Sequence, residues 1–222
     1  MIKAVIFDLD ETLLDRKETM QRFLRDQHAR FNGQLRHATA DSYAEKVLFH
    51  QKNGYAKKWE AYRNALAELG IEDANPQTLF QDYLDNYGAQ PVLFAETVPV
   101  LEKLAGKYKL GIITNGRIAG QNRKVDHSGI RPYFATVLTS EAAGVEKPDA
   151  RIFHKCLEAL NVSPEESVCV GDHPEYDVEG AIGAGLRGIW MRCDHFDPPA
   201  KHHGMISNLN ELPPMLDQFA SA

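Results

Sequence analysis

The chain has 222 residues, of which 43% are hydrophobic and 25% charged, a balance typical of a folded globular protein and not of a disordered or fibrous one. Its length predicts one large domain, or one domain that carries an insertion. Lys and Arg number 25 against 31 Asp and Glu, for a net charge of -6. Such a balance offers no broad basic surface to a nucleic-acid polymer, which we therefore exclude as a partner.

No run approaches the roughly 18 apolar residues that cross a bilayer, and the first residues lack the pattern of a signal peptide. We therefore expect a cytoplasmic protein that does not engage a membrane. The three cysteines, Cys156, Cys169 and Cys193, form no CxxC pair, which predicts reduced thiols, two of them buried, and neither disulfides nor a cysteine zinc site. No feature of the sequence points to a particular oligomeric state.

Five short apolar runs predict buried strands, at residues 4–7, 110–113, 136–138, 168–170 and 188–191. From the second run onward the strands alternate with helical patterns, at residues 98–107, 117–128, 149–160 and 178–183. This alternation is typical of a parallel sheet that helices cover on both faces. The expected fold class is therefore α/β, with a doubly wound sheet.

Residues 16–91 interrupt this alternation and contain no convincing strand. Four amphipathic patterns predict helices at residues 17–31, 41–52, 59–69 and 78–87, separated by Gly33, Asn53-Gly54, Gly70 and Pro76. We therefore expect two domains, an α/β core of residues 1–15 and 92–222 and an inserted all-helical domain of residues 16–91. The insertion holds 11 Lys or Arg and 10 Asp or Glu, which leaves 14 and 21 in the core. The negative excess of the core favours a metal ion there.

Two further expectations concern packing. Aromatic residues of the insertion, among them Phe49, Tyr55, Trp59 and Tyr62, have a helical spacing that favours a place in its core over a ligand-binding face. Near the end of the chain, Pro198-Pro199 and Pro213-Pro214 predict turns. The segment around them should pack on the core through Ile206, Leu209, Leu212, Met215, Leu216 and Phe219.

The first predicted strand leads directly into Asp8-Leu9-Asp10-Glu11-Thr12. In an open α/β sheet, ligands bind in the crevice at the carboxyl ends of the strands, where these two carboxylates would lie. Asp is also common as a turn or capping residue after a strand, so the motif alone leaves both interpretations open.

Polar residues follow two later strands as well. Thr114-Asn115-Gly116 would leave backbone N–H groups open to an anion, although it also suits a capping turn. Gly171-Asp172 and Asp177 place two carboxylates five residues apart, and Mg²⁺ prefers such hard oxygen ligands. Lys147 precedes a helix that begins after Pro148; taken alone, it has the character of a solvated charge.

The order of these motifs resembles that of the haloacid dehalogenase-like hydrolases over nearly the whole chain. The four motifs are matched by Asp8 to Thr12, Thr114, Lys147, and Asp172 to Asp177. The resemblance implies a Rossmann-like core, a helical cap formed by the insertion, dependence on Mg²⁺ and, for most members, hydrolysis of a phosphomonoester. The partner it implies is a small phosphorylated metabolite, whose identity it does not specify.

The same resemblance implies a role for each motif residue. Asp8 would be the nucleophile that forms an aspartyl-phosphate, and Asp10 the general acid and base. Thr114, Asn115 and Lys147 would hold the phosphate. The metal would be bound by Asp8, the backbone carbonyl of Asp10, Asp172 and Asp177, the last through water. His173 and Glu175, within the fourth motif, depart from the smaller or amide residues of many members, and the resemblance gives them no role.

Several other functions remain as alternatives. A haloacid dehalogenase would carry an aromatic residue at the position of Asp10, so that residue argues against dehalogenation, whereas a phosphomutase would retain both aspartates. A response-regulator receiver domain also combines acidic residues, Thr and Lys, but it is shorter and has no helical insertion. A member of the family that only binds its ligand would lack one of the reacting residues, and all of them are present.

Overall fold

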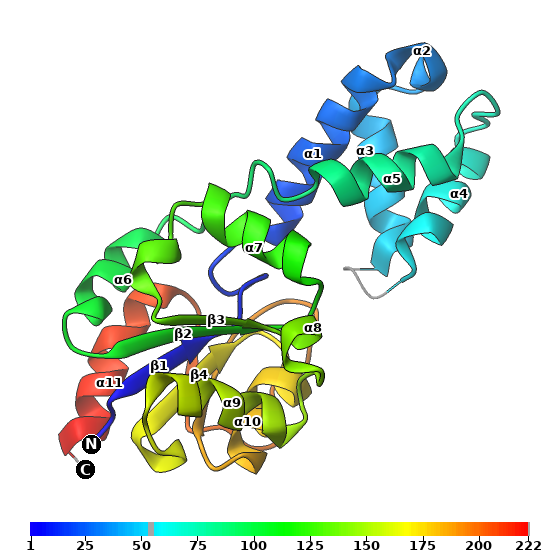
Figure 1. The fold of residues 1–222 in the computed structure, drawn as a ribbon. Coiled ribbons are helices and arrows are strands. Elements are labelled where there is room, and N and C mark those ends of the chain that lie inside the picture. Colours follow the sequence, from blue (N-terminus) through cyan, green and yellow to red (C-terminus); the bar gives the residue numbers. More distant parts are fainter. Residues whose placement is uncertain (53–55, 222) are drawn as a thin grey trace. The chain divides into compact units, whose positions relative to one another are not determined.

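The computed structural model describes residues 1–52 and 56–221 (Figure 1). Contacts divide these residues into two compact units. One unit comprises Met1–Asp15 and the chain from Leu93 onward, and the other comprises Arg16–Val92. The predicted break at Asn53-Gly54 and the aromatic residue Tyr55 lie outside the described residues.

The first unit contains a six-stranded parallel sheet with the order β3-β2-β1-β4-β5-β6. All five predicted strands are confirmed, with small extensions. The strands are β1 (Ala4–Phe7), β2 (Lys109–Thr114), β3 (Thr136–Thr139), β4 (Ser167–Gly171), β5 (Arg187–Met191) and β6 (Gly204–Ile206). The sequence did not predict β6, because this edge strand has only three residues, of which one is glycine and one, Met205, is exposed.

The strand order brings three motifs to one edge of the sheet. The last residue of β1, Phe7, pairs with Ile112 of β2 on one side and with Val170 of β4 on the other. All three strands run in the same direction, so the residues that follow them emerge at the same carboxyl edge. Asp8, Thr114 and Asp172 are therefore neighbours in space, although more than 160 positions separate the first from the last.

Helices cover both faces of this sheet, as the sequence predicts. They are α6 (Thr97–Ala105), α7 (Ile118–His127), α8 (Ser140–Ala143), α9 (Ala150–Leu160), the π-helix η4 (Pro174–Glu179), α10 (Gly180–Gly183) and α11 (Leu212–Ser221), with short 3-10 turns η2 (Arg131–Tyr133), η3 (Pro164–Glu166) and η5 (Leu209–Glu211). Figure 1 shows α6 and α11 on the opposite side of the sheet from α9 and α10. None of the helices in the described ranges has the length and hydropathy needed to cross a membrane.

Two corrections concern helix starts. The helix predicted at residues 178–183 begins earlier, at Pro174, because proline fits the first helical turn and the His173 ring accepts a hydrogen bond from the Tyr176 N–H. The predicted turn at Pro213-Pro214 is wrong: both prolines lie in the first turn of α11. The backbone N–H groups of a first turn have no partner within the helix, so proline is tolerated there.

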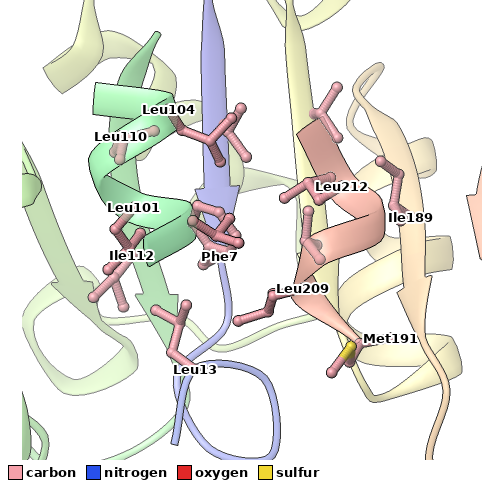
Figure 2. Packing of buried hydrophobic residues seen from close by; sticks show 14 of the residues in the cluster. Phe7, Leu13, Leu101, Leu104, Leu110, Ile112, Ile189, Met191, Leu209 and Leu212 are labelled. Carbon is pink, nitrogen blue, oxygen red and sulfur yellow. The ribbon is translucent and has the colours of Figure 1, made fainter. Parts of the chain in front are cut away.

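The two faces of the sheet have separate hydrophobic cores because side chains alternate along each strand. In β1, Val5 and Phe7 belong to one core, and Ala4 and Ile6 belong to the other. Figure 2 shows the first core, where side chains of α6 and of the C-terminal segment pack over the sheet next to Phe7. All six predicted anchors of the C-terminal segment lie in or against this core. Cys156 and Cys169 lie in the second core, so the prediction of free thiols with two buried is confirmed.

The second unit contains only helices among its described residues. They are α1 (Arg16–Arg30), α2 (Asn32–Leu35), α3 (Ala40–Gln51), α4 (Lys58–Glu68) and α5 (Pro76–Asn86). The four predicted helices are confirmed within two residues, and the short α2 occupies the predicted break at Gly33. Side-chain caps define two helix starts: Thr39 accepts from the Ser42 N–H before α3, and Asn75 accepts from the first N–H groups of α5.

This unit has its own hydrophobic core, which includes Tyr43 and Tyr62. The expectation that aromatic residues pack inside is confirmed for Tyr62 but wrong for Phe49 and Trp59, which are 72% and 37% exposed. Phe49 lies on the outer side of α3, and the Trp59 ring is covered by the Arg63 guanidinium at 5.0 Å. Helical spacing alone could not distinguish the two faces of these helices.

Candidate active site

Asp8 is held at the end of β1 by the sheet itself. Its backbone N–H donates to the Val170 carbonyl oxygen at 2.9 Å, which continues the pairing with β4. The chain then turns back, as the N–H groups of Leu13 and Leu14 both donate to the Leu9 carbonyl, with Glu11 at a positive φ of 61°. This turn fixes Asp8 and Asp10, two residues apart, at the end of β1.

The carboxylates of Asp8, Asp172 and Asp177 form a buried cluster in which one oxygen of each lies within 4.8 Å of the others. Asp172 follows β4, and its backbone carbonyl accepts a hydrogen bond from the Trp190 indole at 2.7 Å. Asp177 comes from η4, and its Oδ2 accepts from the His173 N–H at 2.9 Å. The cluster thus combines three of the four predicted metal ligands; the fourth, Asp10, would contribute its backbone carbonyl.

Lys147 joins two of these carboxylates. Its Nζ donates to Asp8 Oδ1 and Asp177 Oδ1, both at 2.6 Å, and to the Ile113 carbonyl at 3.0 Å. Asn115 fixes the lysine backbone, since its side chain both accepts from the Lys147 N–H at 2.9 Å and donates to the Lys147 carbonyl at 3.1 Å. The side chain of Asn115 therefore positions Lys147.

Burial and charge both perturb this cluster. Burial raises the pKa of Asp8 to about 7, against the opposing effect of the Lys147 ammonium. Burial and the neighbouring charges of Asp177 and Asp8 raise the pKa of Asp172 well above its usual range. Burial would lower the pKa of Lys147, but the carboxylates of Asp177 and Asp8 outweigh it and raise the value. Three carboxylates around one ammonium leave a negative excess that a cation would neutralise.

The donor set fits a small hard cation. All three side chains offer carboxylate oxygens, which Mg²⁺ prefers, and no cysteine or histidine nitrogen belongs to the cluster among the described residues. Mg²⁺ keeps several waters and substrate oxygens among its ligands, so a cluster of few carboxylates suits it better than a complete protein cage.

The second half of the site surrounds Asp10 and Thr114. Gln121 Nε2 donates to Thr114 Oγ1, and it lies 3.3 Å from Asp10 Oδ2. Lys124 Nζ contacts the same Asp10 oxygen at 2.6 Å. Sequence reasoning missed both residues of α7. No sequence pattern marks them, because both are polar and their burial beside Val125 is seen only in the structure.

His173 and Glu175 are placed differently. The His173 ring stacks on Tyr176 with 3.8 Å between ring centroids and an interplanar angle of 7°. Burial lowers the pKa of His173. Glu175 is exposed and lies outside the buried carboxylate cluster. The structure thus gives His173 a local role in holding η4, whereas nothing in it explains the extra carboxylate of Glu175.

Gly171→Ala is expected to disrupt the site, because a Cβ at this position would overlap the side chain of Asp177. The required shift should cost about 1–3 kcal/mol of stability and move Asp177 away from Lys147. Thermal unfolding, and the rate of phosphate release that the sequence resemblance implies, would measure both effects. The matched control is Gly183→Ala in α10, where an added Cβ meets nothing within 4 Å; it should keep full activity. Equal behaviour of the two variants would contradict the prediction.

Comparisons with known proteins agree with this arrangement. A family model described as haloacid dehalogenase-like hydrolase matches residues 2–185. The pyrimidine 5'-nucleotidase YjjG of Escherichia coli (strain K12) is 33% identical over 186 residues, which cover 82% of this chain and 72% of the nucleotidase. The phosphoserine phosphatase of Thermus thermophilus is 28% identical over 248 residues, which cover 95% and 98% of the two chains.

One solved structure is similar over nearly the whole chain. The putative HAD-hydrolase YfnB from Bacillus subtilis, solved with bound magnesium, superposes with a TM-score of 0.77 at 25% identity, covering 97% of this chain and 99% of YfnB. The similarity spans both the sheet and the helical insertion, since nearly all of each chain is matched.

Proposed function

The chain belongs to the haloacid dehalogenase-like hydrolases, as its motifs predict, and on that premise we propose that it is a Mg²⁺-dependent phosphatase acting through an aspartyl-phosphate on Asp8. That it is a phosphomonoester hydrolase follows from the family and from its phosphatase relatives. The observation that supports the finer proposal is Lys147, which bridges Asp8 and Asp177 inside a buried carboxylate cluster.

Asp8 is the proposed nucleophile. Lys147 holds Oδ1 at 2.6 Å, which fixes the orientation of the carboxylate at the end of β1. A covalent intermediate divides one difficult displacement into two easier ones. Asp10, two residues further along, would protonate the leaving alkoxide and then take a proton from the attacking water.

Asp8, the Asp10 carbonyl and Asp172 would hold Mg²⁺, with Asp177 acting through water. When bound, the metal would screen the repulsion between the carboxylates and an anionic phosphate. Thr114, the backbone amide of Asn115 and Lys147 would hold the phosphate oxygens as their charge redistributes. Lys147 places its ammonium between Asp8 and Asp177, so it would both attract the phosphate and offset the acids.

We propose that the substrate is a small phosphorylated metabolite and that the helical unit, Arg16–Val92, is a cap that controls access to the site. Curated relatives differ in the substrate that their names give, among them a pyrimidine nucleotide and phosphoserine. One scaffold can serve different substrates when the core supplies the chemistry and a separate element selects the substrate. Dehalogenation is disfavoured because Asp10 can protonate an oxygen leaving group, which displacement of a halide does not need.

The test is a panel of phosphorylated metabolites incubated with Mg²⁺, with release of inorganic phosphate as the readout. Excess chelator should lower the rate at least about 100-fold, because the unscreened carboxylates repel the substrate. Mg²⁺ or Mn²⁺ should restore activity, whereas Ca²⁺ should inhibit, since it accepts more ligands at longer distances. Full turnover in chelator would contradict the metal dependence, and transfer of phosphate within a sugar bisphosphate without release would indicate a phosphomutase.

A further inference from the structure

Helix α7 presents two polar side chains where its buried stripe faces the sheet. Gln121 and Lys124 are buried together with Val125. A lysine is rarely buried without an ionic partner, because loss of hydration penalises its charge. The partner here is Asp10, whose Oδ2 lies 2.6 Å from Lys124 Nζ. The Asp10 side chain is 23% exposed and that of Lys124 only 5%, so the lysine contacts the acid from the buried side of the pair.

Gln121 links the same acid to the second motif. Its Nε2 contacts Thr114 Oγ1, Asp10 Oδ2 at 3.3 Å and the Asn115 carbonyl at 3.4 Å. An amide nitrogen carries two hydrogens, so it can satisfy two of these acceptors at once. The side chain also packs over Gly116, where an added Cβ would lie 3.1 Å from Gln121 Cγ. Gln121 is thus enclosed by the loop that follows β2.

We propose that Gln121 and Lys124 are positioning residues that hold the Asp10 carboxylate and the Thr114 hydroxyl in fixed places relative to Asp8. The inference rests on the proposed function, in which Asp10 transfers the proton and Thr114 holds the phosphate. Both donors meet Oδ2 of Asp10, which fixes the orientation of that carboxylate. A displacement of about 1 Å in such a group can cost about 100-fold in rate.

If Lys124 had a purely structural role, its substitution should lower the rates on all esters equally. Removal of one partner from a fully buried ion pair is costly, but the Asp10 side chain is 23% exposed, so water can hydrate its charge when the lysine is lost. Lys124→Met keeps the length and the apolar stem of the side chain, so it should still fill the stripe beside Val125. The positioning role therefore predicts a variant that folds normally but transfers the proton poorly.

Leaving groups of different acidity give the decisive readout. In single-turnover measurements with Mg²⁺, we expect Lys124→Met to slow phosphoenzyme formation from an alkyl phosphate about 100-fold, and from p-nitrophenyl phosphate less than about 5-fold, because a nitrophenolate scarcely needs protonation. KM should change little. Lys124→Arg should recover much of the loss, since it keeps a cation opposite Asp10. Gln121→Leu, a second variant, should show the same preference for the aryl ester.

The matched control is Lys103→Met on α6, an exposed lysine near the start of β2, at the opposite edge of the sheet. It removes the same charge and should leave both rates unchanged. Equal losses on both esters, or no loss in Lys124→Met, would overturn the positioning role while the wild-type phosphatase activity stands. A wild-type protein that releases phosphate from no ester would overturn the proposed function, and this inference with it.

Discussion

Asp8→Asn is expected to eliminate the phosphoenzyme and to lower kcat by at least about 10⁴, equivalent to roughly 5.5 kcal/mol of barrier. The amide has no anionic oxygen to attack phosphorus. Three contacts fix the position of Asp8. It is buried, its backbone N–H donates to the Val170 carbonyl, and its carboxylate accepts from Lys147 Nζ at 2.6 Å.

The loss of activity should not come from unfolding. Burial raises the pKa of Asp8 to about 7, so above that pH its ionised form is less favourable in the folded protein than in the unfolded chain. Removing it should leave the unfolding temperature of the metal-free protein unchanged or higher above pH 7. Lys147 keeps its ion pair with Asp177 in the variant.

Mass spectrometry of acid-quenched protein would detect the phosphoenzyme, and steady-state rates would measure kcat. Asp217→Asn, an exposed acid on α11, is the matched control for loss of one negative charge and should behave as wild type. A phosphorylated Asp8→Asn protein would show that another group is the nucleophile. An Asp8→Asn variant with near-normal rates would overturn the aspartyl-phosphate altogether.

The strand ends could be predicted because local sequence determines them. Each of the three strands around the site is a short apolar run that is followed within two residues by a polar side chain, so Asp8, Thr114 and Asp172 mark the carboxyl edge. The parallel order of the sheet then brings them together. Lys147 could not be predicted in this way, because a single lysine before a proline carries no local signal for burial. Only the resemblance to the family indicated a role for it.

Features that depend on tertiary partners could not be predicted in this way. The π-helix η4 requires the His173 ring as a cap, and no periodicity distinguishes it from an α-helix. The polar residues Gln121 and Lys124 have the spacing of a packing stripe, and only the positions of Asp10 and Thr114 show why they are buried there. The contacts of the Asn115 side chain with the Lys147 backbone likewise depend on a residue 32 positions away.

Asp10→Asn is expected to separate the two steps of the reaction. The nucleophile remains, but the variant can neither donate a proton to the leaving group nor accept one from water. Hydrolysis of an alkyl phosphate should fall about 10²–10⁴-fold, the usual contribution of a general acid or base. The first step with p-nitrophenyl phosphate should suffer less, and the phosphoenzyme should accumulate as its hydrolysis slows.

The substitution also changes the surroundings of Lys124, because an amide cannot form the ion pair that the carboxylate forms at 2.6 Å. A double variant, Asp10→Asn with Lys124→Met, distinguishes this effect from the lost proton transfer. If Lys124 acts through Asp10, the double variant should be no slower on the alkyl ester than Asp10→Asn alone. Additive losses would show that Lys124 acts independently, and wild-type rates in Asp10→Asn would show that another group carries the proton.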